Sequence, residues 1–201
     1  MADENDKFPL HTAARERRVA VAEGLLKTSP KLSQKKDDDG RCAIHWAASS
    51  NSLDIVVLLA NQPSFDPDVQ DESGWTPLMI AASVPESEDV IKVLLRAGAD
   101  INAKSCYPLH RAAAVGSVPM CQLLLKKLSP TNPQDVEGYT PLHHAVAEGH
   151  GDAAVALLKE GADVAIKNAE GEVALELAPD KEIRTYILRA AEREGIELEG
   201  Q

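Results

Sequence analysis

The sequence is poor in aromatic residues, with only 2 Trp, 3 Tyr and 2 Phe among its 201 residues. Most globular cores contain several of these large rings. Here 29 Ala and 22 Leu supply most of the apolar content instead. Small residues together with Leu favour helices that pack closely and repeatedly, without one large centre to fill.

Cysteines and long apolar runs are scarce as well. The three cysteines, at 42, 106 and 121, are odd in number and irregular in spacing, which excludes a disulfide framework and suits a reducing compartment. We expect these thiols to be small packing residues. No apolar run is longer than that from Ile55 to Ala60, which is far shorter than the roughly 20 residues of a membrane span. The beginning, MADENDK, has no apolar stretch typical of a signal peptide, so we expect a protein of the cytoplasm and nucleus.

Positive charge is also in short supply. The chain has 21 Lys and Arg against 32 Asp and Glu, which gives a formal net charge of −11. Proteins that bind nucleic acid need a basic face toward the phosphates, and anionic membrane surfaces attract basic segments. The composition therefore predicts neither nucleic acid nor a membrane as a partner.

Catalytic and metal-binding motifs are absent from the sequence: it contains no CxxC pair, HExxH, GxxxxGK or GxGxxG. Four of the six histidines occupy one position of the repeats described below, which favours a structural hydrogen bond over a ligand role. His143 and His144 are adjacent, so they lie about 100° apart on a helix and cannot chelate one metal together. We predict no enzymatic activity, no cofactor and no metal. The four equivalent histidines are His11, His45, His110 and His143.

What the sequence does contain is a repeat with a period near 33 residues. The aligned third residues of six segments are spaced by 34, 34, 31, 33 and 33 residues. Each segment is followed by a second apolar stripe of helical period, so every unit holds two helices. The segments are FPLHTAA at 8, CAIHWAA at 42, TPLMIAA at 76, YPLHRAA at 107, TPLHHAV at 140 and VALELAP at 173.

The residues of this pattern have identifiable physical roles. Pro in the first helical turn lacks an unsatisfied N–H, and the Thr before it can cap the helix. Paired Ala lets a neighbouring helix approach closely. Four acidic or polar turns that end in Gly (DDDG, DESG, DVEG and NAEG) predict tight hairpins, because Gly adopts positive φ readily. Since no unit can bury its own apolar face, neighbouring units must stack.

This pattern resembles the ankyrin repeat, and the resemblance extends over essentially the whole chain. It implies an all-α fold: an ankyrin-repeat solenoid of six helix-turn-helix repeats with short β-hairpin-like fingers. We predict one domain, 1–201, whose end repeats are atypical because the first lacks an upstream finger and the last lacks T-P-L-H. The expected repeats cover approximately 1–36, 37–70, 71–102, 103–134, 135–167 and 168–201.

In an ankyrin stack, finger tips and inner helices line one concave side, and we predict protein binding there. Arg, Trp and Tyr follow three of the finger glycines, and these residue types dominate binding hot spots. The surrounding acids indicate a largely basic protein partner, although they could also serve only to keep the array soluble. The predicted protein-binding residues are Asp38, Asp39, Arg41, Glu72, Trp75, Arg111, Glu137, Tyr139 and Glu148.

The two tryptophans are expected to differ in exposure. Trp75 follows a finger Gly, so we expect it at an exposed finger tip. Trp46 follows His45 on an inner helix, where we expect it to pack in the core between stacked repeats. Arg111 takes the corresponding position of the fourth repeat and is expected to extend toward the concave side.

Four longer segments resemble one particular group of ankyrin-repeat proteins: DGRCAIHWAAS, DESGWTPLMIAAS, YPLHRAAAVGS and GYTPLHHAVAEGHGDAAVALL. They resemble gankyrin and its fungal counterparts. That resemblance implies a monomeric chaperone of proteasome regulatory-particle assembly. Its concave face would bind the C-terminal helical domain of one proteasomal ATPase subunit and so delay docking of the ATPase ring on the proteolytic core. The carried-over contact residues are Asp39, Arg41, Glu72 and Trp75, and more weakly Glu148.

A second function stays open on the sequence alone. The same scaffold suits a regulator of transcription or of the cell cycle, which would bind a kinase or a transcription factor. An accessory module of an enzyme is disfavoured, because the repeats leave no room for a second domain.

The sequence departs from the gankyrin family in repeat number, since that family has seven repeats and this chain shows six. Only five residues separate Lys104 from Leu109, whereas eight separate Lys167 from Leu175 at the corresponding point of the last repeat. We predict that about one repeat has been removed between Ser105 and Cys106. The shortened finger should form a distorted loop with fast hydrogen exchange.

Overall fold

The computed structural model describes residues 6–102, 107–127, 129–196 and 198. Over these residues the regular secondary structure is helical, apart from one isolated antiparallel bridge between Lys167 and Val173. The all-α prediction is therefore confirmed. The chain forms two compact units, residues 1–100 and 101–201, which are described separately.

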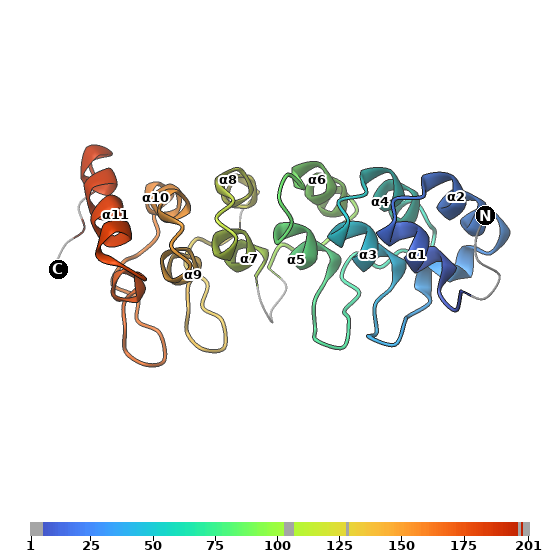
Figure 1. Ribbon diagram of the computed structural model, residues 1–201, viewed down its shortest axis with the longest axis horizontal. Helices are drawn as coiled ribbons and strands as arrows, with labels where there is room; N and C mark the ends of the chain where they lie inside the picture. Colours follow the sequence, from blue (N-terminus) through green and yellow to red (C-terminus); the bar gives the residue numbers. More distant parts are fainter. Residues whose placement is uncertain (1–5, 103–106, 128, 197, 199–201) are drawn as a thin grey trace. The chain divides into compact units, whose positions relative to one another are not determined.

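The N-terminal unit contains three pairs of antiparallel helices in two layers (Figure 1). The first helix of each pair packs on the first helix of the next, and the second helices do the same. This is the predicted stacking of helix pairs. The inner layer is α1 (Pro9–Arg15), α3 (Ala43–Ser49) and α5 (Pro77–Ala82), and the outer layer is α2 (Val19–Thr28), α4 (Leu53–Ala60) and α6 (Glu88–Arg96), with a 3-10 turn, η1 (Pro30–Gln34), after α2.

The second unit repeats this arrangement with a modified end. Helix α7 packs on α9 and α9 on the 3-10 helix η2, while α8 packs on α10 and α10 on α11. The elements are α7 (Pro108–Ala114), α8 (Val118–Lys126), α9 (Pro141–Ala147), α10 (Gly151–Lys159), η2 (Ala174–Leu177) and α11 (Lys181–Arg193).

The core of both units is built from aliphatic residues and Ala, as the composition predicts. The aligned third residues of the six segments are at most 3% exposed, and the paired alanines that follow are fully buried or nearly so. Small side chains at the pair positions allow neighbouring inner helices to pack closely. The aligned residues are Leu10, Ile44, Leu78, Leu109, Leu142 and Leu175.

The inner helices begin as their sequences predict. Pro occupies the first turn of four of them. Thr140 closes the start of α9 twice: its Oγ1 accepts a hydrogen bond from the His143 backbone N–H at 3.4 Å, and its backbone N–H donates to His143 Nδ1 at 3.1 Å. Thr76 Oγ1 caps α5 in the same way, by accepting from the Met79 backbone N–H at 3.3 Å.

The last repeat differs from the others because it lacks T-P-L-H. In place of an inner α-helix, its VALELAP segment forms only the short helix η2. The longer α11 follows, and the carboxylate of Asp180 caps it by accepting from the Ile183 backbone N–H at 2.7 Å. The expectation of an atypical last repeat is confirmed.

Among the described residues, four fingers project from the inner helices of their units as tight loops: residues 37–40, 71–74, 135–138 and 168–171 (Figure 1). In each, the backbone N–H of the first residue donates to the carbonyl of the residue after the Gly, at 2.9 to 3.1 Å. Neighbouring fingers are also joined, by Glu72 N–H to the Asp39 carbonyl and by Ala169 N–H to the Glu137 carbonyl. The hairpin-like fingers are therefore confirmed.

Finger glycines are required for two reasons. Gly40 has φ +71° and Gly138 has φ +80°, a conformation that side chains disfavour. The neighbouring finger also leaves no room, because a Cβ at Gly40 would lie 2.8 Å from Glu72 Cγ and one at Gly138 would lie 2.9 Å from the Ala169 nitrogen.

Some sequence predictions fall beyond what the structure tests. The junction between Ser105 and Cys106 lies outside the described residues, so the lost repeat and the distorted loop stay predictions. The repeat limits and the single domain 1–201 also stay predictions. In the part of the chain that the structure describes, none of the helices combines the length and the apolar character that crossing a membrane requires.

Candidate protein-binding surface

The predicted binding residues divide between exposed acids and half-buried larger side chains. In the N-terminal unit, the acids lie at the finger tips, and in the second unit Glu137 lies at a finger tip and Glu148 at the end of α9. The exposed residues are Asp38, Asp39, Glu72, Glu137 and Glu148; the half-buried ones are Arg41, Trp75, Arg111 and Tyr139.

The two tryptophans do not behave as the sequence suggests. Trp75 is half-buried, because it closes its finger and lies next to the buried start of α5. Trp46 is also half-buried and not a core residue, since its indole has a polar partner outside the helix layers. The expected contrast between an exposed and a buried tryptophan was therefore wrong.

Asp37, the first residue of its finger, holds Trp46 in place. Its Oδ1 accepts from the backbone N–H groups of Asp39 at 3.0 Å and Arg41 at 2.9 Å, which closes the turn. Its Oδ2 accepts from Trp46 Nε1 at 2.7 Å. Burial alone would raise the pKa of Asp37, but these hydrogen bonds lower it below its usual value, so the carboxylate stays charged.

Asp71, the first residue of the next finger, holds Arg41 in the same manner. Its Oδ1 accepts from the backbone N–H groups of Ser73 and Trp75, both at 2.9 Å. Its Oδ2 pairs with Arg41 Nε at 3.1 Å, and the Asp71 side chain is only 3% exposed. Burial opposes ionisation of this carboxyl, yet the Trp75 N–H and the Arg41 guanidinium bring its pKa below the usual value.

Two guanidinium groups lie against the ring of Trp46. Arg41 Cζ is 5.2 Å from the ring centroid and Arg15 Cζ is 5.8 Å from it, both within the range of a cation–π interaction. We call Arg15, Asp37, Arg41, Trp46 and Asp71 the indole–arginine cluster. It joins two fingers and two inner helices of the N-terminal unit in one polar surface.

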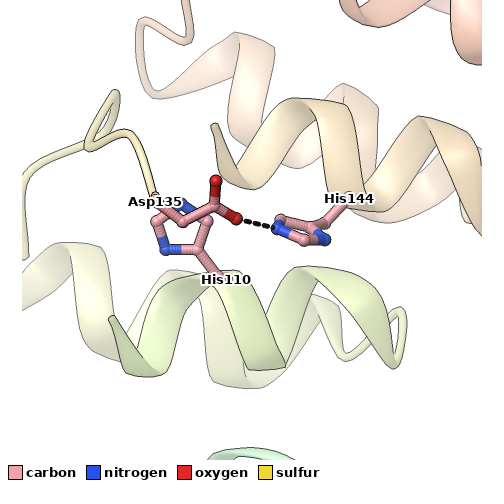
Figure 2. A group of neighbouring side chains, drawn as sticks. All are labelled: His110, Asp135 and His144. Carbon is pink, nitrogen blue, oxygen red and sulfur yellow. Dashed lines mark hydrogen bonds and ion pairs between the residues drawn. The ribbon is translucent and has the colours of Figure 1, made fainter. Parts of the chain in front are cut away.

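The second unit has a related arrangement at the start of the finger formed by residues 135–138 (Figure 2). Asp135 Oδ1 accepts from the backbone N–H groups of Glu137 at 3.1 Å and Tyr139 at 2.9 Å, and Oδ2 pairs with His144 Nε2 at 2.8 Å. The Tyr139 ring lies 5.6 Å from the rings of both His143 and His144. His144 thus takes the place that Trp46 holds in the N-terminal unit, and Tyr139 that of Arg41.

Three possible metal-ligand atoms lie within 4.8 Å of one another, one each from His110, Asp135 and His144 (Figure 2). We therefore tested whether these residues fit a metal ion. His110 Nε2 faces the finger and bonds to the Tyr139 carbonyl at 2.9 Å, whereas Nδ1 is buried without a hydrogen-bond partner among the described residues. A metal bound at Nε2 would displace the proton to Nδ1, which has no acceptor. Metal-bound histidines normally donate that second N–H, so these residues do not fit a metal site.

The four equivalent histidines join their inner helices to the following fingers, which confirms the structural role predicted for them. Each Nε2 contacts the carbonyl of the residue after the next finger Gly. Burial lowers the pKa of all four, and that of His110 to about 4. The contacts are His11 with Arg41 at 2.9 Å, His45 with Trp75 at 3.2 Å, His110 with Tyr139 at 2.9 Å and His143 with Glu172 at 3.3 Å.

Cys42 and Cys121 are buried free thiols, in agreement with their predicted packing role. Burial raises the pKa of Cys42, and it raises that of Cys121 to about 12. The thiolate is the reactive form, so both environments disfavour nucleophilic chemistry. Cys106 lies outside the described residues, and the absence of enzymatic activity stays a prediction.

Comparison with known proteins agrees with this architecture. A family model described as ankyrin repeats (3 copies) matches residues 10–105 and 103–168, well over half of the chain. The chain belongs to the ankyrin-repeat family. The ankyrin repeat domain of Bcl-3 has a similar solved structure, with a TM-score of 0.76 at 28% identity, covering 94% of this chain and 86% of that one.

Two fungal relatives match this chain over most of their own length. A probable 26S proteasome regulatory subunit p28 of Saccharomyces cerevisiae is 34% identical over 90% of this chain and 97% of that protein. An ankyrin repeat-containing protein of Schizosaccharomyces pombe is 33% identical over 88% and 92%. The S. cerevisiae alignment spans 224 positions, more than the 201 residues of this ankyrin-repeat chain, so that relative has residues within the aligned region that this chain lacks. This agrees with a lost repeat, whose position stays a prediction.

Three residues that position the side chains of this surface are absent from the predicted binding set. Asp37, Asp71 and Asp135 each begin a finger, and the finger of residues 168–171 begins with the similar Asn168. That recurrence was the available signal, because Asp and Asn side chains commonly accept hydrogen bonds from backbone N–H groups two residues ahead. The pairing of Asp71 with Arg41 depends on the stacking of two repeats, and the pairings of Asp37 with Trp46 and of Asp135 with His144 depend on the folding of one repeat.

Proposed function

We propose that this ankyrin-repeat protein is an assembly chaperone of the proteasome regulatory particle. It binds the C-terminal domain of a proteasomal ATPase subunit through its fingers and inner helices. While bound, it delays docking of the ATPase ring on the proteolytic core. The observation that carries this proposal is the similarity to the S. cerevisiae proteasome regulatory subunit, which extends over nearly the whole of both proteins.

The surface of the N-terminal unit supports a protein partner of mixed charge. Exposed acids at the finger tips, Asp38, Asp39 and Glu72, favour basic side chains on the partner. Between them, Arg41 is already oriented by Asp71 and Trp46 and so is suited to receive a partner carboxylate. A side chain held in its bound geometry loses less entropy on association than a free one.

The second unit carries its own set of proposed contact residues. Tyr139 is half-buried beside two imidazole rings, and Glu137 and Glu148 are exposed. Half-buried aromatic residues flanked by exposed charge are typical of interface anchors. Arg111, half-buried on α7, belongs to the same proposed set.

The test is direct binding to purified C-terminal domains of the proteasomal ATPase subunits, offered one at a time in isothermal titration calorimetry. One domain should bind with one-to-one stoichiometry, and the others should bind at least about tenfold more weakly. If none of the domains binds, the proposal is wrong.

The choice of variant matters for this test. Arg41→Glu would set a new carboxylate against the buried Asp71, so a loss of binding could arise from unfolding. Arg41→Met keeps most of the packing and removes only the charge. It should weaken binding by about tenfold or more, as expected of a hot-spot residue, and its circular dichroism spectrum should match that of the wild-type protein.

A cytoplasmic and nuclear location belongs to the same proposal, supported by the small, odd number of cysteines, which suits reducing compartments. A regulator of transcription or of the cell cycle is the alternative, because the ankyrin-repeat scaffold alone does not fix the partner. Affinity purification from cells, followed by mass spectrometry, separates the two. Recovery of proteasomal ATPase subunits favours the chaperone, and recovery of a transcription factor or kinase without them favours the regulator.

A further inference from the structure

Arg15 has no role in the predicted binding site, yet the structure places it beside Arg41 on the same indole. Both guanidinium carbons lie within 6 Å of the Trp46 ring centroid, so they lie within about 11 Å of each other. Two positive groups are thus gathered on one face of a chain whose net charge is −11.

The internal contacts of the cluster leave hydrogen-bond donors unused. Asp71 takes only the Nε of Arg41, and among the described residues neither Nη nitrogen of Arg41 has a hydrogen-bond partner. Arg15 is exposed and makes no ion pair within the described chain; its neighbour Glu16 pairs with Arg18 instead, at 2.8 Å. The Nη groups of Arg41 and the guanidinium of Arg15 are therefore available to acceptors from outside.

A hydrogen bond to Asp37 fixes the orientation of the Trp46 indole between these arginines. Asp37 accepts the Trp46 Nε1–H at 2.7 Å and is itself held by two backbone N–H groups of its finger. Trp46 cannot rotate away without breaking that hydrogen bond. It therefore serves as a rigid platform that keeps the two cations in place.

We propose that Arg15, Arg41 and Trp46 form a site for two carboxylates that one helix of the partner presents a single turn apart. Side chains at positions i and i+4 of a helix have Cβ atoms about 5–6 Å apart, and two Glu side chains from there can reach both guanidinium groups. Each Arg offers paired N–H donors, which match the two oxygens of a carboxylate. The inference rests on the proposed function, because it describes the acidic segment of the same ATPase domain.

The first experiment requires no ATPase domain. An alanine-rich helical peptide with Glu at i and i+4 is titrated into the ¹⁵N-labelled protein, and a matched peptide with Gln at both positions serves as the control. The Glu peptide should shift the NMR signals of the Trp46 indole N–H and the Arg41 Nε–H, while the Gln peptide leaves them in place. Equal shifts with both peptides, or none with the Glu peptide, would overturn the site.

The second experiment uses the ATPase domain that binds the wild-type protein. Arg15→Met should lower its affinity about two- to fivefold, the usual effect of losing one exposed ion pair. Arg18→Met is the matched control, because it removes the same charge from a nearby exposed arginine whose partner is Glu16. If Arg15→Met and Arg18→Met have equal effects, only the overall charge matters and the site is wrong.

Trp46→Leu tests the platform. It removes the ring and the bond to Asp37, so Arg15→Met should have little further effect in that background; two fully additive losses would contradict a shared platform. The free-protein NMR spectrum checks the fold of each variant.

Failure of every ATPase domain to bind would contradict the proposed function alone, since the peptide titration tests the carboxylate site independently.

Discussion

At the scale of single residues, the aspartate that begins three of the described fingers, Asp37, Asp71 or Asp135, serves two purposes at once. One oxygen accepts backbone N–H groups and closes the turn, and the other positions a side chain of the binding surface. Fold and candidate function thus depend on the same group. Asp71 is the clearest case, because its side chain is almost fully buried and its second oxygen binds Arg41.

Substitutions at Asp71 should separate these two purposes. Asp71→Asn retains an oxygen for the turn and loses the ion pair, so it should cost about 1 kcal/mol of unfolding free energy. Asp71→Ala removes both and leaves buried N–H groups without acceptors, which should cost about 2–4 kcal/mol. Urea unfolding at pH 7 measures both values. Asp38→Ala, at an exposed acid paired with the exposed Lys7, is the control and should change stability by less than about 0.5 kcal/mol; equal costs for all three variants would refute the assignment.

The buried histidines make stability depend on pH, and His110 most clearly. Its pKa is about 4 in the folded protein because of burial, against about 6.5 when unfolded. At pH 7 both states are neutral and His110 contributes no pH dependence. As the pH falls from 6.5 to 4, the unfolded chain takes up a proton that the folded chain excludes. The folded state therefore loses about 3 kcal/mol over that window, with no further loss below pH 4.

His110→Gln should remove this part of the pH dependence, because the amide does not titrate and can still donate to the Tyr139 carbonyl. Urea unfolding at several pH values between 7 and 4 measures the slope. The variant should be less stable at pH 7 but should lose less stability than the wild-type protein on acidification. Parallel curves for the two proteins would show that His110 is not excluded from protonation when folded.

At the scale of elements, neighbouring fingers within each unit are joined by backbone hydrogen bonds. The finger glycines allow this close approach. Gly138 and Gly171 both have positive φ, +80° and +86°. They differ in surroundings, since a Cβ at Gly138 would lie 2.9 Å from the Ala169 nitrogen while one at Gly171 would meet nothing within 4 Å. A side chain at Gly171 would therefore meet backbone strain alone, whereas one at Gly138 would meet both backbone strain and crowding.

The corresponding alanine variants should differ in stability. Gly171→Ala carries only the cost of the left-handed conformation, about 1–2 kcal/mol. Gly138→Ala has the same conformational cost, and its new methyl group must also displace the next finger. That displacement breaks the hydrogen bond from the Ala169 N–H to the Glu137 carbonyl. It should cost at least about 1 kcal/mol more. Thermal unfolding of both variants measures the difference, and equal losses would mean that the fingers move apart without cost.

The elements were predictable from sequence because their causes are local. The T-P-L-H segments start helices through Pro and Thr, and the period near 33 implies stacking. The candidate surface was predictable only in part. Arg41 and the acidic tips follow from their place in the repeat, but the partners of Trp46 and His144 lie nine residues away in sequence and meet them only after the repeat folds. Arg15 meets Trp46 across two repeats, so local patterns could not reveal it.

At the scale of the whole molecule, charge sets how partners approach. The chain has a net charge of −11, whereas the indole–arginine cluster contains two arginines and two aspartates, and exposed acids lie in both of its fingers. Long-range attraction should thus come from the acids, while orientation within the complex depends on Arg41. Rate and affinity should respond differently to salt and to substitution, because screening acts mainly on exposed charges.

The association rate with the ATPase domain should therefore fall about tenfold or more as ionic strength rises from roughly 10 to 150 mM. Stopped-flow mixing, monitored by tryptophan fluorescence, measures this rate. A variant with Asp38→Asn, Asp39→Asn and Glu72→Gln should associate more slowly at low salt and show a flatter salt dependence. Arg41→Met should act mainly on the dissociation rate, since Arg41 contributes a short-range contact. An association rate that ignores salt, or a triple variant that behaves as the wild-type protein does, would place the binding surface elsewhere than on these fingers.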